Sequence, residues 1–293
     1  MNTDSNIIGI ILGNGFDIAY GFKTKYNDFI NSEHFKNLLS QGNNLAKFIY
    51  DVNSIQNWVD VEVEIGNYSY KMSQEELSHA EFIEQTKVFK KEYEDLRDAL
   101  SLYISSLTSG YGNHKKMDNL VDEWFIPAFA KPEHKFYVAT FNYHRNDNIA
   151  VLNKYKDHLF GTYLNFIHGI TDFYSKTPCD IVLGVDEICK RARVPEHSFI
   201  VKSYNPHTDC SRFFDTIRLC KKYIIFGCSI GETDHRYFKE IFTQKNKEFL
   251  IYGFGNDEIC KIKSRIAFIC GDYTAFIKNN DVVFEDSTKY SCD

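Results

Sequence analysis

The segment Ile7–Phe22, "IIGIILGNGFDIAYGF", decides the fold that this sequence predicts. Its apolar run ends at Leu12 and is followed at once by "GNGFD", Gly13 to Asp17. A buried strand, a glycine turn and a helix in this order direct backbone N–H groups and a helix N-terminus toward an anion. One glycine makes the turn, and the other leaves room for a pyrophosphate. The segment therefore predicts a nucleotide-binding α/β sheet.

The glycine turn is weak evidence when taken alone. Ile18 stands where the dinucleotide fingerprint G-x-G-x-x-G has its third glycine. The acidic residue expected about 20 positions further on would fall in a region that reads as helix, not at the end of a second strand. An ordinary hydride-transferring dehydrogenase is therefore disfavoured, and a tight turn without a ligand stays an alternative.

The composition indicates a folded protein without a broad nucleic-acid surface. The chain has 293 residues, of which 43% are apolar and 16% aromatic, enough for one large domain or two modest ones. The net charge of −6 argues against direct nucleic-acid binding, which needs a basic face. We interpret the basic run Lys190–Arg193 as a solvated loop or helix end.

The cysteines and the apolar runs indicate the compartment. None of the 8 cysteines forms a C-x-x-C pair, so we expect no zinc knuckle and no metal. No apolar run reaches the roughly 20 residues that span a bilayer, and Ile7–Leu12 is too short for a secretory signal. We expect a cytoplasmic protein with reduced thiols and no membrane partner.

Short apolar segments along the chain predict strands that are buried on both faces of a parallel sheet. They are Ile7–Leu12, Lys135–Thr140, Tyr163–Ile167, Ile181–Leu183, Tyr223–Phe226, Phe249–Tyr252 and Val282–Phe284. We therefore predict an α/β fold: a Rossmann-like parallel sheet flanked by helices, forming a single domain over residues 1–293.

A large helical insertion is predicted at about residues 24–128, after the first strand. Ser73 and Glu76 have the spacing of a capping box, and apolar residues recur after them at helical intervals. We interpret this apolar stripe as core. A surface for a companion protein or a second copy of the chain is the alternative.

Polar or glycine-rich residues follow several of the predicted strands. In an open parallel sheet the carboxyl ends of the strands face one crevice, where ligands bind. We therefore expect these residues to converge, although a single histidine after a strand is more often structural than catalytic. The residues are Gly13 and Gly15, Thr140 and Asn142, His168, Gly227 and Ser229, and Thr233 and Asp234, the last two placed to cap a helix.

The acidic stretch "WVDVEVEIG" allows two secondary structures. As a helix it places Asp60 and Glu64 on one face and its apolar residues on another. As a strand it alternates Asp60, Glu62 and Glu64 with apolar residues. We favour the helix, because the segment lies inside the helical insertion. A solvated acidic face is the alternative to a role in a site.

The stretches together resemble a known family. "ILGNGFDIAYGFKTKYNDF", "WVDVE", "TFNY", "IHG", "VLG" and "GCSIGETDHRYF" are similar to the AbiH-like abortive-infection proteins of bacterial anti-phage defence, which we place with the sirtuin-like NAD-consuming domains. The resemblance runs from about residue 7 to 255. The order and spacing of the stretches are more specific than any one of them.

The resemblance implies a Rossmann-like sheet that binds NAD and cleaves its nicotinamide–ribose bond. It implies the catalytic residues Asn142 and His168. It also implies a set of residues that bind the dinucleotide: Gly13, Asn14, Gly15, Phe16, Asp17, Thr140, Gly227 and Ser229. Asp60, Glu62 and Asp234 are candidate auxiliary carboxylates. NAD is the substrate, and no further cofactor is expected.

Two departures from the sirtuin pattern narrow the activity. Zinc-dependent protein deacylases carry a four-cysteine module, and this chain has no C-x-x-C to build one. The glycine loop also reads G-N-G-F-D where sirtuins have G-A-G-x-S. We therefore expect an NAD glycohydrolase rather than a deacylase.

The expected role is a defence effector that depletes NAD when a partner or ligand activates it. The main alternative is a catalytically silent nucleotide-binding sensor, which would need neither Asn142 nor His168. A third possibility is hydrolysis or transfer on a related nucleotide such as ADP-ribose or NADP.

Overall fold

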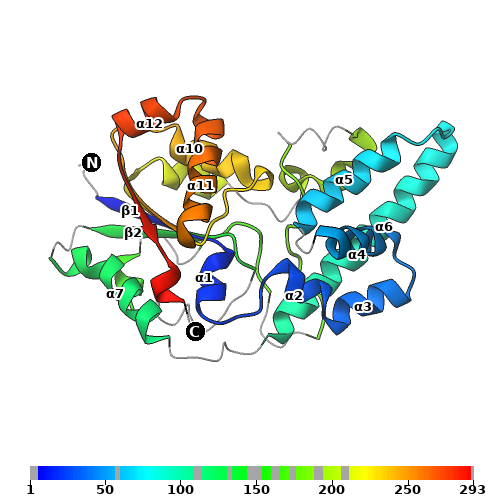
Figure 1. Ribbon diagram of the computed structural model, residues 1–293, viewed down its shortest axis with the longest axis horizontal. Helices are drawn as coiled ribbons and strands as arrows, with labels where there is room; N and C mark the ends of the chain where they lie inside the picture. The colour runs from blue at the N-terminus through cyan, green and yellow to red at the C-terminus, as the bar shows by residue number, and fades with distance from the viewer. Residues whose placement is uncertain are drawn as a thin grey trace.

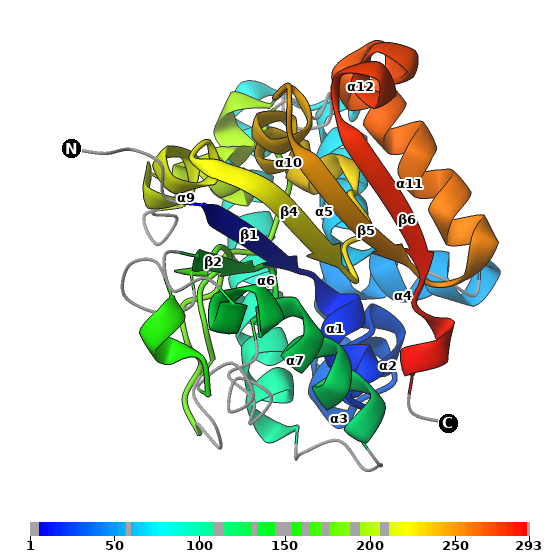
Figure 2. The ribbon, with the colours of Figure 1, turned by 90° about the vertical axis from the view of Figure 1, so that its left-hand side faces the viewer.

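A parallel sheet forms the centre of the fold (Figure 2). The computed structural model describes residues 6–56, 60–107, 114–130, 134–143, 154–159, 165–171, 176–187, 194–205 and 211–291. Within these ranges six strands pair in the order β3-β2-β1-β4-β5-β6, all in parallel. They are β1 (Ile7–Leu12), β2 (Lys135–Thr140), β3 (Asn165–Phe166), β4 (Cys220–Phe226), β5 (Glu248–Gly253) and β6 (Asp281–Asp286). The α/β prediction is confirmed.

The order of the strands reverses between β1 and β4. Chain connections lead from β1 toward β2 and β3 on one side, and from β4 toward β5 and β6 on the other. Such a reversal opens a crevice at the carboxyl ends of the two central strands, because the connecting segments diverge there. Gly13 and Gly227 are the residues that follow these strands.

The alternation of side chains along each strand supplies two apolar faces. Ile7 and Ile11 of β1 join one buried cluster, whereas Ile8, Ile10 and Leu12 join the other. One face packs on α9 (Ser211–Ile217), α10 (His235–Phe242), α11 (Gly255–Cys270) and α12 (Tyr273–Asn279). The opposite face packs on α1 (Asn14–Ala19) and α7 (Lys115–Ala130) (Figure 2).

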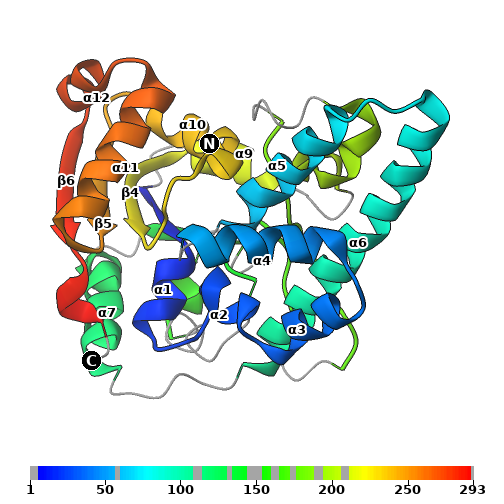
Figure 3. The ribbon, with the colours of Figure 1, turned by 45° about the vertical axis from the view of Figure 1, so that its right-hand side comes forward.

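A second hydrophobic core lies beside the sheet. It is built by α2 (Tyr26–Ile30), α3 (Glu33–Ser40), α4 (Asn44–Gln56), α5 (Val61–Ser73) and α6 (His79–Ser106) (Figures 1 and 3). Residues of the later segment 181–201 complete the same core. We call residues 26–106 together with 181–204 the cap.

Short 3₁₀ helices complete the described structure. Two of them belong to the cap, η3 (Pro195–Ile200) and η4 (Lys202–Tyr204). A third, η5 (Glu232–Asp234), leads into α10. The others are η1 (Lys156–His158) and η6 (Thr288–Tyr290).

The predicted strand Ile181–Leu183 is wrong. These residues are buried in the cap core and pair with no strand of the described sheet. Their backbone groups bond instead to side chains and to other loops: Tyr143 Oη donates to Val182 O at 3.0 Å, and Tyr93 Oη donates to Leu183 O at 2.7 Å. An apolar triplet can therefore be buried without belonging to a sheet.

The helical insertion also differs in detail from its prediction. Helix α7 packs on the sheet and not in the cap, so the cap's first part ends with α6. The capping box belongs to Ser78 and Glu81, at the start of α6, whereas Ser73 is the last residue of α5. Trp58 and Val59 lie outside the described residues, as does the basic run 190–193.

Candidate functional site

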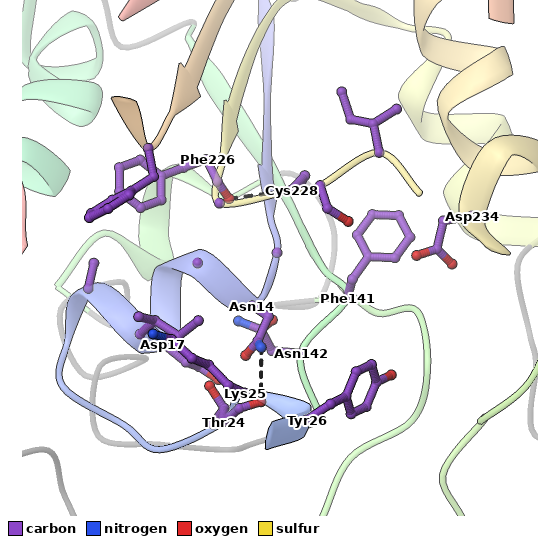
Figure 4. Close-up of a pocket in the computed structure, with 18 of the residues that line it drawn as sticks. Asn14, Asp17, Thr24, Lys25, Tyr26, Phe141, Asn142, Phe226, Cys228 and Asp234 are labelled. Carbon is purple, nitrogen blue, oxygen red and sulfur yellow. Dashed lines mark hydrogen bonds between the residues drawn. The ribbon is translucent and has the colours of Figure 1, made fainter. Parts of the chain in front are cut away.

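A pocket of about 610 Å³ opens at the carboxyl ends of the central strands, between the sheet and the cap (Figure 4). Its size is within the range of small-molecule sites. It is lined from the turn after β1, the ends of β2 and β3, the loop after β4, the segment from the end of β5 into α11, the residues after β6, and the cap. Gly13, Asn142, His168 and Gly227 all line it, as the strand-end argument expected.

The two glycines of the first turn contact Gly227 directly. A Cβ on Gly13 would lie 2.5 Å from Gly227 O, and a Cβ on Gly15 would lie 2.5 Å from Gly227 Cα. Gly227 itself has a φ of +69°, and its own Cβ would lie 2.5 Å from Phe16 N. The close approach that these glycines allow is therefore made between two loops of the chain itself.

This contact also uses the backbone donors of the turn. Gly13 N donates to Phe226 O and Gly15 N to Gly227 O, each at 2.9 Å. Phe16 N donates to Gly13 O, also at 2.9 Å. An anion at this turn would consequently have to be held largely by side chains, which differs from the backbone cradle that the sequence suggested.

The other residues of "GNGFD" point in different directions. The Phe16 ring is buried against Tyr20, Trp124 and Phe226 in the core under the sheet, and does not line the pocket. Asp17 is buried and lines the pocket. Asn14 lines it as well and donates from Nδ2 to Thr24 O at 2.9 Å (Figure 4).

The loop after β4 has a strained backbone. Ile230 is buried and has a φ of +56°, which is an outlier for a β-branched residue. Such strain persists only where the surroundings over-determine it, and it clusters at functional sites. Ser229 lines the pocket, and its carbonyl oxygen accepts a hydrogen bond from Arg265 Nη1.

The asparagine after β2 has an unsatisfied buried oxygen. Asn142 is 6% exposed, and its Oδ1 has no hydrogen-bond partner among the described residues. Its backbone N–H donates to Thr140 Oγ1 at 3.1 Å, which fixes the turn that aims Asn142 into the pocket. Thr140 therefore supports Asn142 and does not itself line the pocket. A buried, unpaired carbonyl costs stability, as expected of a group kept for a ligand.

The histidine after β3 lies against a carboxylate. His168 is 3% exposed, and its Nε2 lies 3.1 Å from Asp234 Oδ1. Nε2 is buried, and the Asp234 carboxylate is the charged group that faces it. Asp234 was expected to cap α10, but its side chain accepts no cap hydrogen bond and turns toward His168.

A lysine of the cap completes this cluster. Lys202 is 3% exposed, and its Nζ lies 2.9 Å from Glu62 Oε2 and 2.8 Å from Asp234 Oδ1. Lys202 and Glu62 belong to the cap, whereas Asp234 precedes α10 on the sheet side. The ion pairs thus join the two parts of the molecule beside His168.

The acidic stretch forms the start of a helix, as favoured from the sequence. Asp60 is the N-cap of α5 and accepts hydrogen bonds from the backbone N–H groups of Glu62 and Val63, at 3.1 and 3.3 Å. Glu62 binds Lys202 through one oxygen and accepts from Gly184 N at 3.3 Å through the other. Both carboxylates line the pocket, but both already hold parts of the cap together.

One extended segment of the cap, residues 180–186, supports both sides of the cluster. Val182 N donates to His168 O at 2.8 Å, and Lys202 N donates to Val185 O at 2.9 Å. Between them lies Gly184, with a φ of +141°, whose Cβ would fall 2.0 Å from Ile200 O. The glycine of "VLG" therefore lets two cap segments cross and brings Lys202 under Glu62.

Burial and charge set the protonation of the cluster. Burial lowers the pKa of His168, and the nearby Lys202 lowers it further. Burial would raise the pKa of Asp234, but Lys202 and His168 hold it well below its usual value. Burial raises the pKa of Glu62 despite Lys202, with help from Asp234. At neutral pH the cluster therefore holds a neutral imidazole beside an ionised Asp234 and a protonated Lys202.

Sequence reasoning missed Lys202 and two tyrosines at this site. Both tyrosines, Tyr26 and Tyr143, line the pocket, and Figure 4 shows Tyr26. Burial raises the pKa of both phenols well above the usual range, so both remain protonated donors. The sequence signal for Lys202 was slight: a lysine directly after the apolar pair Ile200 and Val201.

Among the described residues, no group of three or more His, Cys, Asp or Glu side chains is placed to hold a metal ion. Within the same ranges, every helix is too short or too polar to cross a membrane.

A comparison with models of protein families identifies the family of the chain. A family model described as bacteriophage abortive infection AbiH matches residues 10–252.

The chain belongs to the AbiH family. The match starts in β1 and ends in β5, so it contains the whole cap and the ends of β1, β2, β3 and β4 at the pocket. Membership of this family implies that the AbiH chain has a role in bacteriophage abortive infection. No curated protein matches the sequence.

The AbiH pocket is lined by groups of both charges. Asp60, Glu62 and Asp234 line it together with Asn142 and His168. Asn14, Lys25 and Ser229 add an amide, an ammonium and a hydroxyl to the same lining. A ligand that carries both a cation and an anion would match these charges.

Proposed function

We propose that this AbiH chain hydrolyses NAD at the bond between nicotinamide and ribose. The observation that carries the proposal is a pair of buried groups in one pocket: Asn142 Oδ1, which has no hydrogen-bond partner among the described residues, and the His168 imidazole, whose Nε2 faces Asp234. An amide oxygen and a neutral imidazole are the groups needed to hold and deprotonate a water or a ribose hydroxyl.

The charged groups that line the pocket would orient the substrate. The nicotinamide ring of NAD carries a positive charge, and the sugar becomes oxocarbenium-like as the bond breaks. Both positive charges favour a position beside the Asp234 carboxylate and His168. The pyrophosphate then lies toward Asn14, Lys25 and Ser229, whose side chains take the place of the backbone donors that Gly13 and Gly15 use internally.

The chemical step needs no acid for the leaving group. The N-glycosidic bond breaks with its electron pair going to nicotinamide, which departs neutral. Asn142 orients the attacking water, whose oxygen forms the new bond to C1′. The His168 imidazole takes the proton, and Asp234, whose Oδ1 lies 3.1 Å from Nε2, stabilises the imidazolium that results. Among the three candidate auxiliary carboxylates, Asp234 thus has the clearest role, because Asp60 and Glu62 are occupied in the cap.

The test is to incubate the purified chain with NAD and separate nicotinamide from ADP-ribose. The wild type is compared with Asn142→Ala, His168→Ala and the control His79→Gln, an exposed histidine at the start of α6. We expect release that both site variants reduce by about 100-fold or more and that the control retains. Release that survives both substitutions would refute the site.

A second measurement covers a wild type that releases nothing. Binding of NAD by calorimetry without product would favour the alternative function, a nucleotide sensor. Absence of binding would overturn the interpretation of the glycine turn. An NAD-depleting effector is toxic when unregulated, so we propose that full activity requires a companion protein, a second copy or a small ligand. Adding phage-infected cell extract to the assay tests this requirement.

A further inference from the structure

A buried lysine that the proposed chemistry does not use lies next to the candidate base. Lys202 enters the cluster from η4 of the cap, and its side chain is 3% exposed. Its ammonium is 2.8 Å from the Asp234 oxygen that also lies 3.1 Å from His168 Nε2. One carboxylate oxygen is therefore shared between a lysine of the cap and a histidine of the sheet.

We propose that Lys202 is a positioning residue that holds Asp234 beside His168 and keeps the imidazole in its proton-accepting form. This inference rests on the proposed function, in which His168 is the base. Lys202 would touch neither water nor sugar. It acts through Asp234, and its correct placement depends on the cap.

The charges around Asp234 determine whether the His168 ring is protonated. A carboxylate alone with a histidine at this distance would favour the imidazolium, because an opposite charge within about 4–6 Å stabilises the protonated ring. Lys202 supplies a full positive charge to the same oxygen and lies on the side of the cap. Because Lys202 already pairs with Asp234, the His168 ring does not have to be protonated to give Asp234 a charged partner. The ring therefore stays neutral and can accept a proton.

The groups facing His168 come from four elements. Asp234 is the last residue of η5, and Lys202 lies in η4. The rings of Tyr143, after β2, and Tyr237, in α10, lie 5.9 and 6.0 Å from the imidazole, measured between ring centroids. Of these groups, only Asp234 and Lys202 carry charge at neutral pH, so their balance sets the protonation of His168.

Both the backbone and the side chain of Lys202 are held by other residues of the cap. Its backbone N–H donates to Val185 O, and its ammonium binds Glu62 Oε2 at 2.9 Å. Glu62 is held in turn by Gly184 N. Movement of the cap relative to the sheet would withdraw Lys202 and Glu62 together. Asp234 would then face His168 without Lys202 beside it. The position of the cap relative to the sheet therefore affects whether His168 is neutral and able to act as the base.

The first test measures the titration midpoint of His168 by NMR of histidine-labelled protein, with His168→Ala to assign the signal. We compare the wild type with Lys202→Met and with the control Lys247→Met. Lys247 is a part-buried lysine that donates to Cys220 O, at the opposite end of the sheet. We expect Lys202→Met to raise the midpoint by about one pH unit or more and Lys247→Met to leave it unchanged. An unchanged midpoint in Lys202→Met would overturn the proposal.

A second variant covers the case in which Lys202→Met does not fold. Glu62→Gln keeps the shape of the side chain but frees Lys202 to pair with Asp234 alone. We expect the midpoint of His168 to fall in this variant, opposite to the change in Lys202→Met. An unchanged or raised midpoint in Glu62→Gln would contradict a positioning role.

The third measurement uses activity and separates the two proposals. In Lys202→Met, we expect kcat for nicotinamide release to fall at least 10-fold and the acidic limb of the pH–rate profile to move to higher pH. Lower activity with an unmoved acidic limb would refute the positioning role. If the wild type releases no nicotinamide even with phage-infected cell extract, the proposed function fails, while the NMR comparison still decides the role of Lys202.

Discussion

Gly15 and Gly227 lie in direct backbone contact across the switch point of the sheet. A Cβ on Gly15 would stand 2.5 Å from Gly227 Cα, and Gly15 N donates to Gly227 O at 2.9 Å. The turn after β1 and the loop after β4 therefore form one unit. Residues that would contact a ligand from either loop are placed by this contact.

The contact predicts a large cost for a single methyl group. We expect Gly227→Ala to destabilise the fold by about 3 kcal/mol or more, because the new Cβ would overlap backbone atoms in addition to adopting a positive φ. Gly271→Ala is the matched control, since Gly271 has a φ of +73° but nothing within 4 Å of its Cβ. We expect it to cost only about 1–2 kcal/mol. Urea denaturation measures both, and similar losses would disprove the overlap.

The unpartnered oxygen of Asn142 predicts opposite effects on activity and stability. Asn142→Ala should abolish nicotinamide release and yet leave the free energy of unfolding unchanged or raise it by up to about 1 kcal/mol, because a buried unsatisfied group is removed. Asn43 is a matched control. It is equally buried, but it donates to Glu92 O at 3.0 Å and accepts from Ala46 N at 2.8 Å. Asn43→Ala should lose about 1–3 kcal/mol. Equal losses in the two variants would argue against a vacant ligand-binding oxygen.

A buried histidine in the cap predicts acid sensitivity. His197 lies between Ser69 Oγ at 2.8 Å and Thr86 Oγ1 at 3.2 Å, and burial lowers its pKa. Above about pH 6.5 both folded and unfolded chains hold a neutral ring, so stability is fully present. As the pH falls below that value, the unfolded chain gains a proton first, and stability is lost at up to about 1.4 kcal/mol per pH unit.

Unfolding at pH 7.5 and pH 5.5 measures this effect. We expect His197→Gln to lose less stability over this interval than the wild type does. The exposed His79→Gln should behave as the wild type. Equal losses in wild type and His197→Gln would assign the acid sensitivity to other groups, such as His168, whose pKa is lowered in the same direction.

The capping box of α6 predicts a modest, local effect. Ser78 Oγ accepts from Glu81 N, and the Glu81 carboxylate accepts from Ser78 N at 2.9 Å. Ser78→Ala should lower the free energy of unfolding by about 1 kcal/mol. Ser73→Ala, at the end of α5, should change it by less than about 0.5 kcal/mol. Thermal unfolding distinguishes the two, and a larger effect at Ser73 would contradict the observed helix boundary.

The sheet could be predicted because its signals are local. Apolar runs such as Ile7–Leu12 and Lys135–Thr140 match β1 and β2 residue for residue. The polar ends of these strands meet because parallel strands all end at one edge of the sheet. The pocket therefore contains Asn142 and His168, which lie far apart in the sequence.

The errors arose where tertiary contacts override local patterns. Ile181–Leu183 has the composition of a buried strand, but tyrosine hydroxyls and cap loops satisfy its backbone. Ser73 and Ser78 each have a glutamate three residues later, and only the length of α5 decides which one caps a helix. Lys202 gave almost no local signal, because its role depends on Glu62 and Asp234, which lie 140 residues before it and 32 after it.

The two-part construction of the cap has a consequence for how the chain folds. Its core joins residues 26–106 to residues 181–201, and β2 and β3 lie between these parts in the sequence. During synthesis the first five cap helices leave the ribosome long before the segment that completes their core. The cap is therefore expected to mature late, after β1, β2 and β3 have come together, and its amides should exchange with solvent before those of the central strands.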